Sequence, residues 1–357
     1  MATTMKAVGK STTTNPTPKI STDQKPPDIK NSKGPATSLF INPSTPIPTP
    51  LPGQALVKIH AFGLNRMDLI QRLGHYPLPP QAPSTLGVEF SGTIISFGSP
   101  SLTSGFSVND AVFGLAYGGA YAEYIAVSVK MLLHKPAHLS FVQAAGIPET
   151  WITATQALHL VLGITEGKSI LWHAGASGVS IAGIQLSRLA GASAIYATAG
   201  SQAKCEFIEK ELGATKAFNY KDGGRDWAEE IMRETGGKGV DLIVDFVGAD
   251  YFQRNLDVVA REGRIVLLGL MSGSTVEKAD IGKLLFKAAR IEGSTLRSRD
   301  EEYQGRLRDK LEEYLPRFES GELKVFIDTV MDWGDIVKAH QLLEANTTTG
   351  KIICTIS

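Results

Sequence analysis

The stretch that most constrains the fold of this chain joins a short apolar run to a glycine-rich turn and then to a helical pattern. The run Ile170–Trp172 is uninterrupted, as expected for a buried strand, and a turn containing Gly175 follows it. From Val179 to Ala190 the apolar residues recur at helical spacing. A strand, a glycine turn and a helix in this order place backbone N–H groups at a helix N-terminus, where a phosphate or pyrophosphate binds.

The glycine pattern of this turn is incomplete, so by itself it is a weak indication of a nucleotide site. Gly175 and Gly178 are present, but Ser180 stands where a third glycine would follow. An ordinary strand-to-helix turn is the alternative. The serine leaves open how closely the helix packs against the strand.

The segments that follow favour a nucleotide-binding sheet. Strand-like runs alternate with helical patterns, which predicts βαβ units, a parallel sheet and right-handed crossovers. The expected strands are Ile170–Trp172, Ala194–Ala199, Ala217–Asn219, Asp241–Phe246, Arg264–Leu268 and Arg290–Glu292, and the expected helices are Ile181–Leu189, Ala203–Leu212, Asp226–Glu234, Tyr251–Val259 and Ile281–Ala288. A glycine turn after the first strand of such a sheet is the dinucleotide-binding arrangement.

Both ends of the chain have a different pattern. Residues 51–133 carry strand-like runs between Gly and Pro clusters, which predicts a β-rich module with another strand entered at Val108–Val112. The runs are Ala55–His60, Val88–Ile95 and Ala120–Val127, and the C-terminal end predicts the helix Tyr303–Phe318, the strand Val325–Val330, the helix Ile336–Leu343 and the strand Lys351–Ile356. We expect this end to complete the first module, giving domains 1–149, 150–292 and a return segment 293–357.

Composition excludes several classes of protein. The 357 residues hold 36 Lys and Arg against 36 Asp and Glu, so no charge excess favours nucleic acid or an anionic membrane. Cys205 and Cys354 are far apart and have no metal-like spacing, which is typical of a reduced intracellular protein. No apolar run approaches the ~20 residues of a membrane span. We expect a soluble, cytoplasmic protein.

Residues 10–35 are rich in Thr, Pro, Lys and Asn and carry few large apolar side chains, which predicts a disordered insertion. A mitochondrial presequence is disfavoured because the stretch has no Arg and contains Asp23 and Asp28.

The end of the second expected strand indicates the cofactor. Enzymes that prefer NAD usually carry an acidic residue there, which binds the ribose hydroxyls. Here the strand runs into Gly200 and Ser201, with Lys204 one helical turn later, and Tyr220 ends the next strand. A hydroxyl and an ammonium suit a phosphate, so we predict NADPH. The alternative is that Ser201 only caps the following helix and Lys204 is solvated.

Several segments together are similar to one family. They are Ala61–Leu69, Gln71–Pro77, Leu86–Gly92, Ala144–Ala154, His173–Val179, Thr198–Lys204, Asn219–Lys221, Leu296–Asp300, Ala339–His340 and Gly350–Ile352. The chain resembles the quinone oxidoreductase (zeta-crystallin) branch of the zinc-independent medium-chain dehydrogenase/reductase superfamily, and within it most resembles the tumour-suppressor-inducible quinone oxidoreductase group. The resemblance covers nearly everything except residues 10–35, and Ser180 departs from it.

The resemblance implies an α/β protein in which a GroES-like β-rich catalytic domain, built from both chain ends, clasps a Rossmann NADPH-binding domain, with a cleft between them and usually a homodimer. It implies Asn65 and Tyr76 as catalytic residues, Asn65 near the nicotinamide and the substrate carbonyl, and Tyr76 as an aromatic wall or a donor to a quinone oxygen. The alternative for Tyr76 is loop packing. The implied cofactor-binding residues are Thr153, Gly175, Ala176, Ser177, Gly178, Val179, Ser201, Lys204, Tyr220, Gly269, Leu270 and Met271.

The same comparison argues against a metal. Zinc alcohol dehydrogenases of the superfamily carry a cysteine ligand where this sequence has Asn65, and a Gly-His-Glu triplet where it has Gly87-Val88-Glu89. Without a Lewis acid, alcohol oxidation is disfavoured and reduction of an electron-poor acceptor by hydride transfer remains. Asp68 is expected to brace the backbone, and Glu149 is a candidate proton donor by its chemistry alone.

Three functions remain open at this stage. The first is an NADPH:quinone oxidoreductase acting on small quinones. The second is an enoyl reductase acting on an α,β-unsaturated thioester or carbonyl, for which no basic cluster that would bind phosphopantetheine is visible in the sequence. The third is a non-catalytic, NADPH-regulated RNA-binding relative, which the neutral charge disfavours.

Overall fold

A computed structural model describes residues 3–10, 33–103, 105–223 and 226–357, and these divide into two compact units. Unit 1 comprises Met1–Glu149 and Arg297–Ser357, and unit 2 comprises Thr150–Leu296. Most of the predicted disordered insertion, residues 11–32, lies outside the described residues. Among the residues that are described, no helix combines the length and the apolar composition needed to cross a membrane.

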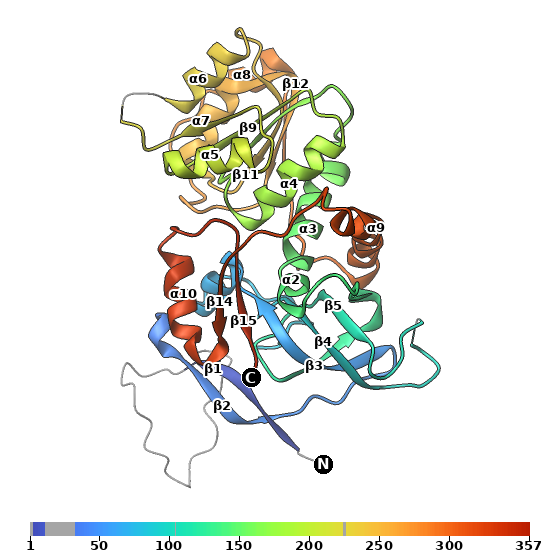
Figure 1. Cartoon of the computed structure of the whole chain (residues 1–357). Coiled ribbons are helices and arrows are strands. Elements are labelled where there is room, and N and C mark those ends of the chain that lie inside the picture. The colour runs from blue at the N-terminus through green and yellow to red at the C-terminus, as the bar shows by residue number, and fades with distance from the viewer. Residues whose placement is uncertain (1–2, 11–32, 104, 224–225) are drawn as a thin grey trace. The chain divides into compact units, whose positions relative to one another are not determined.

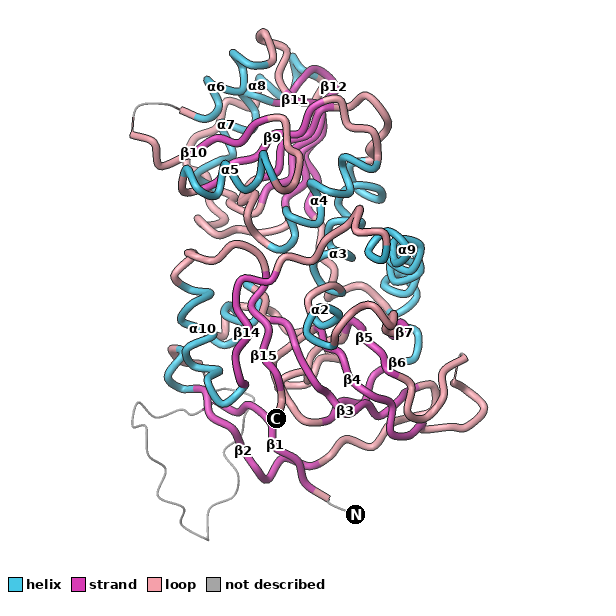
Figure 2. The backbone as a smooth tube through the Cα atoms, in the orientation of Figure 1, coloured by secondary structure: helices cyan, strands magenta, loops and turns pink. Residues whose placement is uncertain are grey.

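Unit 2 is built around one six-stranded parallel sheet (Figure 2). Its strands are β8 (Ser169–Trp172), β9 (Ala194–Ala199), β10 (Lys216–Asn219), β11 (Val240–Asp245), β12 (Val259–Leu267) and β13 (Arg290–Gly293). Their order in space is β10-β9-β8-β11-β12-β13, so the winding direction reverses between β8 and β11. A ligand crevice is expected outside the carboxyl ends of the strands at such a reversal.

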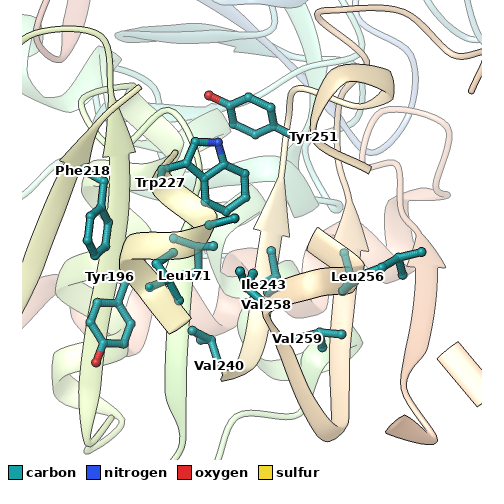
Figure 3. Close-up of a cluster of buried hydrophobic side chains, with 13 residues drawn as sticks. Leu171, Tyr196, Phe218, Trp227, Val240, Ile243, Tyr251, Leu256, Val258 and Val259 are labelled. Atoms are coloured by element: carbon teal, nitrogen blue, oxygen red, sulfur yellow. The ribbon is translucent and has the colours of Figure 1, made fainter. Parts of the chain in front are cut away.

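Five helices connect these strands (Figure 1). They are α4 (Gly178–Leu189), α5 (Gln202–Lys210), α6 (Trp227–Glu234), α7 (Ala249–Val258) and α8 (Gly282–Lys287). The strand β8 is covered on both faces. Leu171 packs in a buried cluster with α6 and α7 (Figure 3), and Trp172, on the other face, contacts α4. Burial of both faces explains why β8 is an uninterrupted apolar run in the sequence.

The strands and helices predicted for this unit are confirmed, and their boundaries agree within three residues except at the start of β12. The helix α7 ends at Val258 and β12 begins at Val259, five residues earlier than expected. The segment Arg261-Glu262-Gly263 has the composition of a loop, yet it lies within the strand as an irregularity in which Glu262 takes a φ of 62°. The sequence analysis predicts no helix for Pro148–Thr155, which forms α3 and crosses the boundary between the units. This helix continues into a π-helix at Gln156–Leu162.

Unit 1 contains two sheets. The seven-stranded sheet has the order β14-β15-β3-β4-β5-β7, with β6 paired to β3, and a two-stranded sheet joins β1 to β2. Its elements are β1 (Thr4–Lys10), β2 (Leu39–Pro46), β3 (Gln54–Gly63), α1 (Arg66–Arg72), β4 (Glu89–Phe97), β5 (Ala111–Leu115), β6 (Tyr124–Ser128), β7 (Leu132–His134), α2 (Phe141–Ala145), α9 (Glu301–Glu319), β14 (Ile327–Asp332), α10 (Ile336–Glu344) and β15 (Lys351–Thr355).

The C-terminal end completes this sheet, because β15 pairs antiparallel with β3 from the N-terminal part of the chain. The C-terminal helices and strands are confirmed. Two details of the sequence analysis are wrong. The run Ala120–Val127 is a strand only from Tyr124, and Lys10 belongs to β1 and is buried rather than part of a disordered insertion.

Candidate functional site

Backbone hydrogen bonds, one to β9 and one within the turn, fix the turn that follows β8 in unit 2. The N–H of Gly175 donates to Thr198 O at 2.8 Å, and the N–H of Ser177 donates to Ala174 O at 2.8 Å. A Cβ on Gly175 would lie 2.7 Å from Ile208 Cδ1 and 2.8 Å from Ala197 Cβ, so only glycine fits there. Ser177 is the N-cap of α4, whose first-turn amides are the N–H groups available to an anion.

Ser180 does not disturb the packing of α4, which removes the question raised by the incomplete glycine pattern. It is fully buried, and its hydroxyl donates to His173 O at 2.8 Å. The close approach of helix and strand is achieved one turn later. At Gly183 a Cβ would overlap the ring of Trp172, whose indole N–H donates to Ser187 Oγ at 3.1 Å.

A series of buried side-chain hydrogen bonds supports this turn. His173 Nε2 lies 2.7 Å from Asn255 Oδ1, and Asn255 Nδ2 donates to Asp245 Oδ2 at 2.9 Å. The other imidazole nitrogen lies 3.0 Å from Thr198 Oγ1. Because Asn255 Oδ1 only accepts, His173 donates from Nε2 and accepts at Nδ1. Burial lowers the pKa of His173, so the neutral imidazole of this arrangement is the stable form.

The residues proposed for the cofactor phosphate gather at the ends of β9 and β10. Ser201 is the N-cap of α5 and accepts from the N–H of Lys204 at 3.3 Å, so the capping role is real. A Cβ on Gly200 would lie 2.7 Å from the hydroxyl of Tyr220, which places this phenol beside Ser201. No acidic side chain stands between Ala199 and Lys204.

The remaining cofactor-binding candidates of unit 2 lie on two other segments. Gly269, Leu270 and Met271 follow β12, and the N–H of Met271 donates to Phe246 O at 3.1 Å, just beyond β11. Thr153 lies on α3, and its Oγ1 is buried without a hydrogen-bond partner among the described residues. All candidates of this unit except Thr153 therefore follow the carboxyl ends of strands in one sheet, where a dinucleotide binds.

Asn65, the first catalytic candidate in unit 1, belongs to a buried network with an ion pair. Lys351 Nζ donates to Glu89 Oε1 at 2.5 Å and to Asn65 Oδ1 at 2.9 Å, and Asn65 Nδ2 donates to Glu89 Oε1 at 2.8 Å. The lysine and glutamate side chains are 6% and 0% exposed. A Cβ on Gly63 would overlap the Glu89 carboxylate, so the end of β3 must be glycine for this network to form.

Asp68 braces the backbone, as expected. Its carboxylate accepts from Asn65 N at 2.8 Å, Gly87 N at 3.2 Å and the Tyr121 hydroxyl at 3.1 Å. Burial raises its pKa, and these hydrogen bonds act in the opposite direction.

Tyr76, the second catalytic candidate, is half-buried beneath a cation. The guanidinium carbon of Arg297 lies 5.4 Å from the centre of its ring, a cation–π distance. Burial raises the pKa of Tyr76, and the negative charge of Glu149 adds to this. The phenol therefore stays protonated and able to donate at neutral pH.

Glu149 has a strongly perturbed carboxyl group. Burial raises its pKa to about 8, and the charge of Glu89 contributes. Its own backbone N–H donates to Glu89 Oε2 at 2.9 Å. At neutral pH this side chain is mostly a neutral acid, which is the protonation state required of a proton donor.

The sequence analysis missed Glu89, Lys351 and Arg297 as members of these networks. A signal was present for two of them. Glu89 stands between Val88 and Phe90, and Lys351 stands directly before the apolar run Ile352–Cys354. A charged residue inside an apolar strand is rarely tolerated unless it is paired.

The donor set of unit 1 does not fit a catalytic zinc ion. Zinc sites require Cys, His or carboxylate ligands in a tetrahedral arrangement, whereas the network here contains an amide and an ammonium group. Among the described residues no group of three or more His, Cys, Asp and Glu side chains is arranged to hold a metal.

Comparisons with known proteins agree with this architecture. Residues 51–137 match the family model described as "Alcohol dehydrogenase GroES-like domain", and residues 178–313 match the model described as "Zinc-binding dehydrogenase". The chain is 28% identical over 313 residues to the human protein described as "Quinone oxidoreductase", covering 86% of this chain and 90% of the relative.

Solved structures are similar along most of the chain. An NAD-dependent alcohol dehydrogenase is 31% identical, with a TM-score of 0.79 over 91% of this chain and 98% of that one. The Escherichia coli quinone oxidoreductase complexed with NADPH is 27% identical, with a TM-score of 0.78 over 90% and 97%. The CurK enoyl reductase is 28% identical, with a TM-score of 0.79 over 91% and 97%. With its GroES-like and Rossmann-like units, this chain belongs to the medium-chain dehydrogenase/reductase superfamily.

Proposed function

We propose that this chain reduces small quinones with NADPH by hydride transfer and without a metal ion. Its similarity to quinone oxidoreductases over most of both chains supports the acceptor class. The end of β9 is the observation that carries the choice of cofactor. Ser201 and Lys204 stand there without a carboxylate, and the Tyr220 hydroxyl lies against Gly200. A carboxylate would repel the 2′-phosphate of NADPH, whereas a hydroxyl and an ammonium group bind it.

The residues of unit 2 fit a bound dinucleotide. Gly175, Ala176, Ser177, Gly178 and Val179 form the turn and first helical positions that would hold the pyrophosphate. The hydroxyl of Thr153, which is buried and has no partner among the described residues, would hydrogen-bond the nicotinamide. When bound, the cofactor supplies the hydride, and the protein supplies orientation and a polar environment.

In unit 1, Asn65 and Tyr76 would act on the acceptor. Lys351 and Glu89 fix the amide of Asn65, which keeps one N–H to donate to a substrate oxygen. Tyr76 would offer a flat ring as a wall and its hydroxyl as a donor. Because a quinone oxygen gains negative charge as it is reduced, a donor preorganised at that oxygen accelerates the reaction.

Calorimetric titration with NADPH and NADH tests the cofactor. We expect NADPH to bind more tightly, and Lys204→Glu to weaken NADPH binding about 10- to 100-fold while sparing NADH. Lys210→Glu is the matched control, because it makes the same charge change at an exposed position of α5. Equal affinities for both cofactors in the native protein would refute the phosphate assignment.

A steady-state screen with NADPH tests the acceptor. Turnover of 1,2-naphthoquinone, retained after exhaustive chelation, supports a metal-free quinone reductase. The enoyl reductase alternative, favoured by the similarity to CurK, predicts turnover of crotonyl-CoA instead. If neither is reduced and RNA is retained in a filter-binding assay, the non-catalytic function replaces both.

The variant Tyr76→Phe separates the two roles of that side chain. It keeps the ring beneath Arg297 and removes only the hydroxyl. If the hydroxyl donates to the quinone oxygen, kcat should fall about 10- to 100-fold while NADPH affinity is unchanged. Full activity of the Phe variant would leave Tyr76 a packing role.

We also propose that the protein forms a homodimer through α8 and the β13 edge of the sheet in unit 2. Three large apolar side chains of this region, Ile281, Leu285 and Phe286, are 67%, 77% and 78% exposed. They lie at or on α8, which packs on β12 beside the terminal strand β13. Exposed apolar groups and an unpaired strand edge favour association with a second copy. Phe286→Glu should shift the light-scattering mass from dimer to monomer, and an unchanged mass would reject this surface.

A further inference from the structure

Three cationic side chains are buried close together in unit 1, and they differ in their hydrogen bonds and ion pairs. Lys10, Arg72 and Arg297 are 8%, 1% and 4% exposed. Arg72 is fully engaged, with bonds to Gly34 O and His340 and an ion pair with Glu344. The other two cations form no ion pair with the described residues.

Gln71 connects the two unpaired cations. Its backbone oxygen accepts from Lys10 Nζ at 3.3 Å, and its side-chain oxygen accepts from Arg297 Nη1 at 2.7 Å. Arg297 Nε donates to Tyr117 O at 2.6 Å, but its Nη2 is buried and has no hydrogen-bond partner among the described residues. A buried charged donor left without a partner is costly in a folded protein, so it indicates a place for a ligand group.

The neighbouring carboxyl groups do not form ion pairs with Lys10 or Arg297 that would neutralise their charges. Asp68 attracts both cations, but its bonds go to Asn65 N, Gly87 N and the Tyr121 hydroxyl rather than to Lys10 or Arg297. Glu149 is mostly protonated at neutral pH, because burial raises its pKa to about 8. Burial lowers the pKa of Lys10 to about 8, and repulsion by the charges of Arg72 and Arg297 contributes to this.

Gly118 lies beside the free nitrogen. A Cβ on Gly118 would lie 3.0 Å from Arg297 Nη2, so a side chain at this position would crowd the guanidinium. The same guanidinium lies over the ring of Tyr76, the residue proposed to face the acceptor. The free donor and the acceptor wall therefore belong to one local arrangement.

We propose that Lys10 and Arg297 form a subsite for an anionic group, a carboxylate or sulfonate, carried by the acceptor. Arg297 Nη2 donates to an oxygen of this group and Lys10 supplies the second positive charge. The proposal rests on the proposed reductase function and deepens it by naming a substrate class: acceptors with an acidic substituent.

The test compares two quinones that differ in this substituent, anthraquinone-2-sulfonate and neutral 2-(hydroxymethyl)anthraquinone. Binding to the native protein is measured by calorimetry, and reduction is measured separately with NADPH. We expect the sulfonate to bind about tenfold more tightly than the neutral quinone, and Lys10→Met and Arg297→Lys to remove most of that preference. Lys6→Met is the matched control, because Lys6 lies on the same strand and is exposed.

Equal affinities for the two quinones in the native protein would overturn the subsite. So would variants that weaken both quinones to the same extent, because that pattern indicates a structural role. If Arg297→Lys does not fold, Lys10→Met alone decides. Inorganic sulfate is added as a third probe. Sulfate that binds without competing with the sulfonate quinone overturns the proposal, whereas competition only with the sulfonate quinone supports it. A preference in binding without any turnover would refute the reductase function and leave the subsite standing.

Discussion

The two buried polar networks of this protein, one in each unit, are built from different chemistry. The network of unit 2 links His173, Thr198, Asn255 and Asp245, and its only formal charge is the carboxylate. The network of unit 1 contains the ion pair of Lys351 and Glu89, with Asn65 between them. The network of unit 2 supports a backbone turn and contains one charged group, whereas the network of unit 1 holds two opposite charges away from water.

This difference indicates that the two networks tolerate amino-acid substitution to different extents. A hydrogen bond contributes about 0.5–1.5 kcal/mol net when both groups are neutral and about 1.5–3 kcal/mol when one is charged, and loss of one member leaves its partners desolvated. Removing one partner of a buried ion pair leaves an uncompensated charge, which costs about 3–5 kcal/mol. Unit 1 should therefore be the more sensitive to substitution within its network, although it carries the proposed chemistry of the acceptor.

The largest effect is expected for Lys351→Met. It keeps the length of the side chain but leaves Glu89 buried without its cation, so we expect the free energy of unfolding to fall by about 3–5 kcal/mol. Denaturant unfolding measures it. Lys338→Met is the control, because Lys338 forms an exposed pair with Asp335, and such pairs contribute about 0–1 kcal/mol. Similar losses in both variants would contradict the comparison.

A smaller loss is expected for Asn255→Leu in unit 2. The change leaves His173 Nε2 and Asp245 Oδ2 without their partner, which costs about 1–3 kcal/mol. Because these groups support the turn after β8, NADPH affinity should also fall. Hydrogen exchange should show lost protection in peptides from residues 150–296 and unchanged protection in peptides of unit 1. Loss spread evenly over both units would mean that the networks are not independent.

The effect expected for Glu149→Gln depends on pH and is tested by its change with pH rather than by its size at one pH. The folded state holds the proton up to a pKa of about 8, whereas in the unfolded state this carboxyl titrates near 4.5. Between these values the native protein binds more protons, so the destabilisation caused by Glu149 grows as pH rises from about 4.5 to about 8. The melting temperature of the variant should exceed that of the native protein by more at pH 8 than at pH 5. A constant difference would show that this carboxyl titrates normally.

Prediction from the sequence worked where a local pattern decided the structure. The apolar run Ile170–Trp172 located β8 because burial on both faces leaves no polar residue inside it. It failed where long-range pairing decided. Lys10, at the edge of a polar stretch, becomes the buried end of β1 only because β1 pairs with β2 (Figure 1). The run at Ala120 was read as strand, yet pairing with β3 begins only at Tyr124.

The features of the candidate site also separate into those that a local sequence pattern predicts and those that depend on long-range contacts. The turn at Gly175 and the missing acid after β9 are properties of consecutive residues, and the sequence alone determined that a dinucleotide site with a preference for phosphate is expected there. The structure decided which glycine lets α4 approach β8, since the overlap with Trp172 arises at Gly183 and not at position 180. It also decided the partners of Asn65, because Glu89 and Lys351 are 24 and 286 residues away from it in the chain. Contacts over such distances depend on how β15 pairs with β3, and no local pattern carries that information.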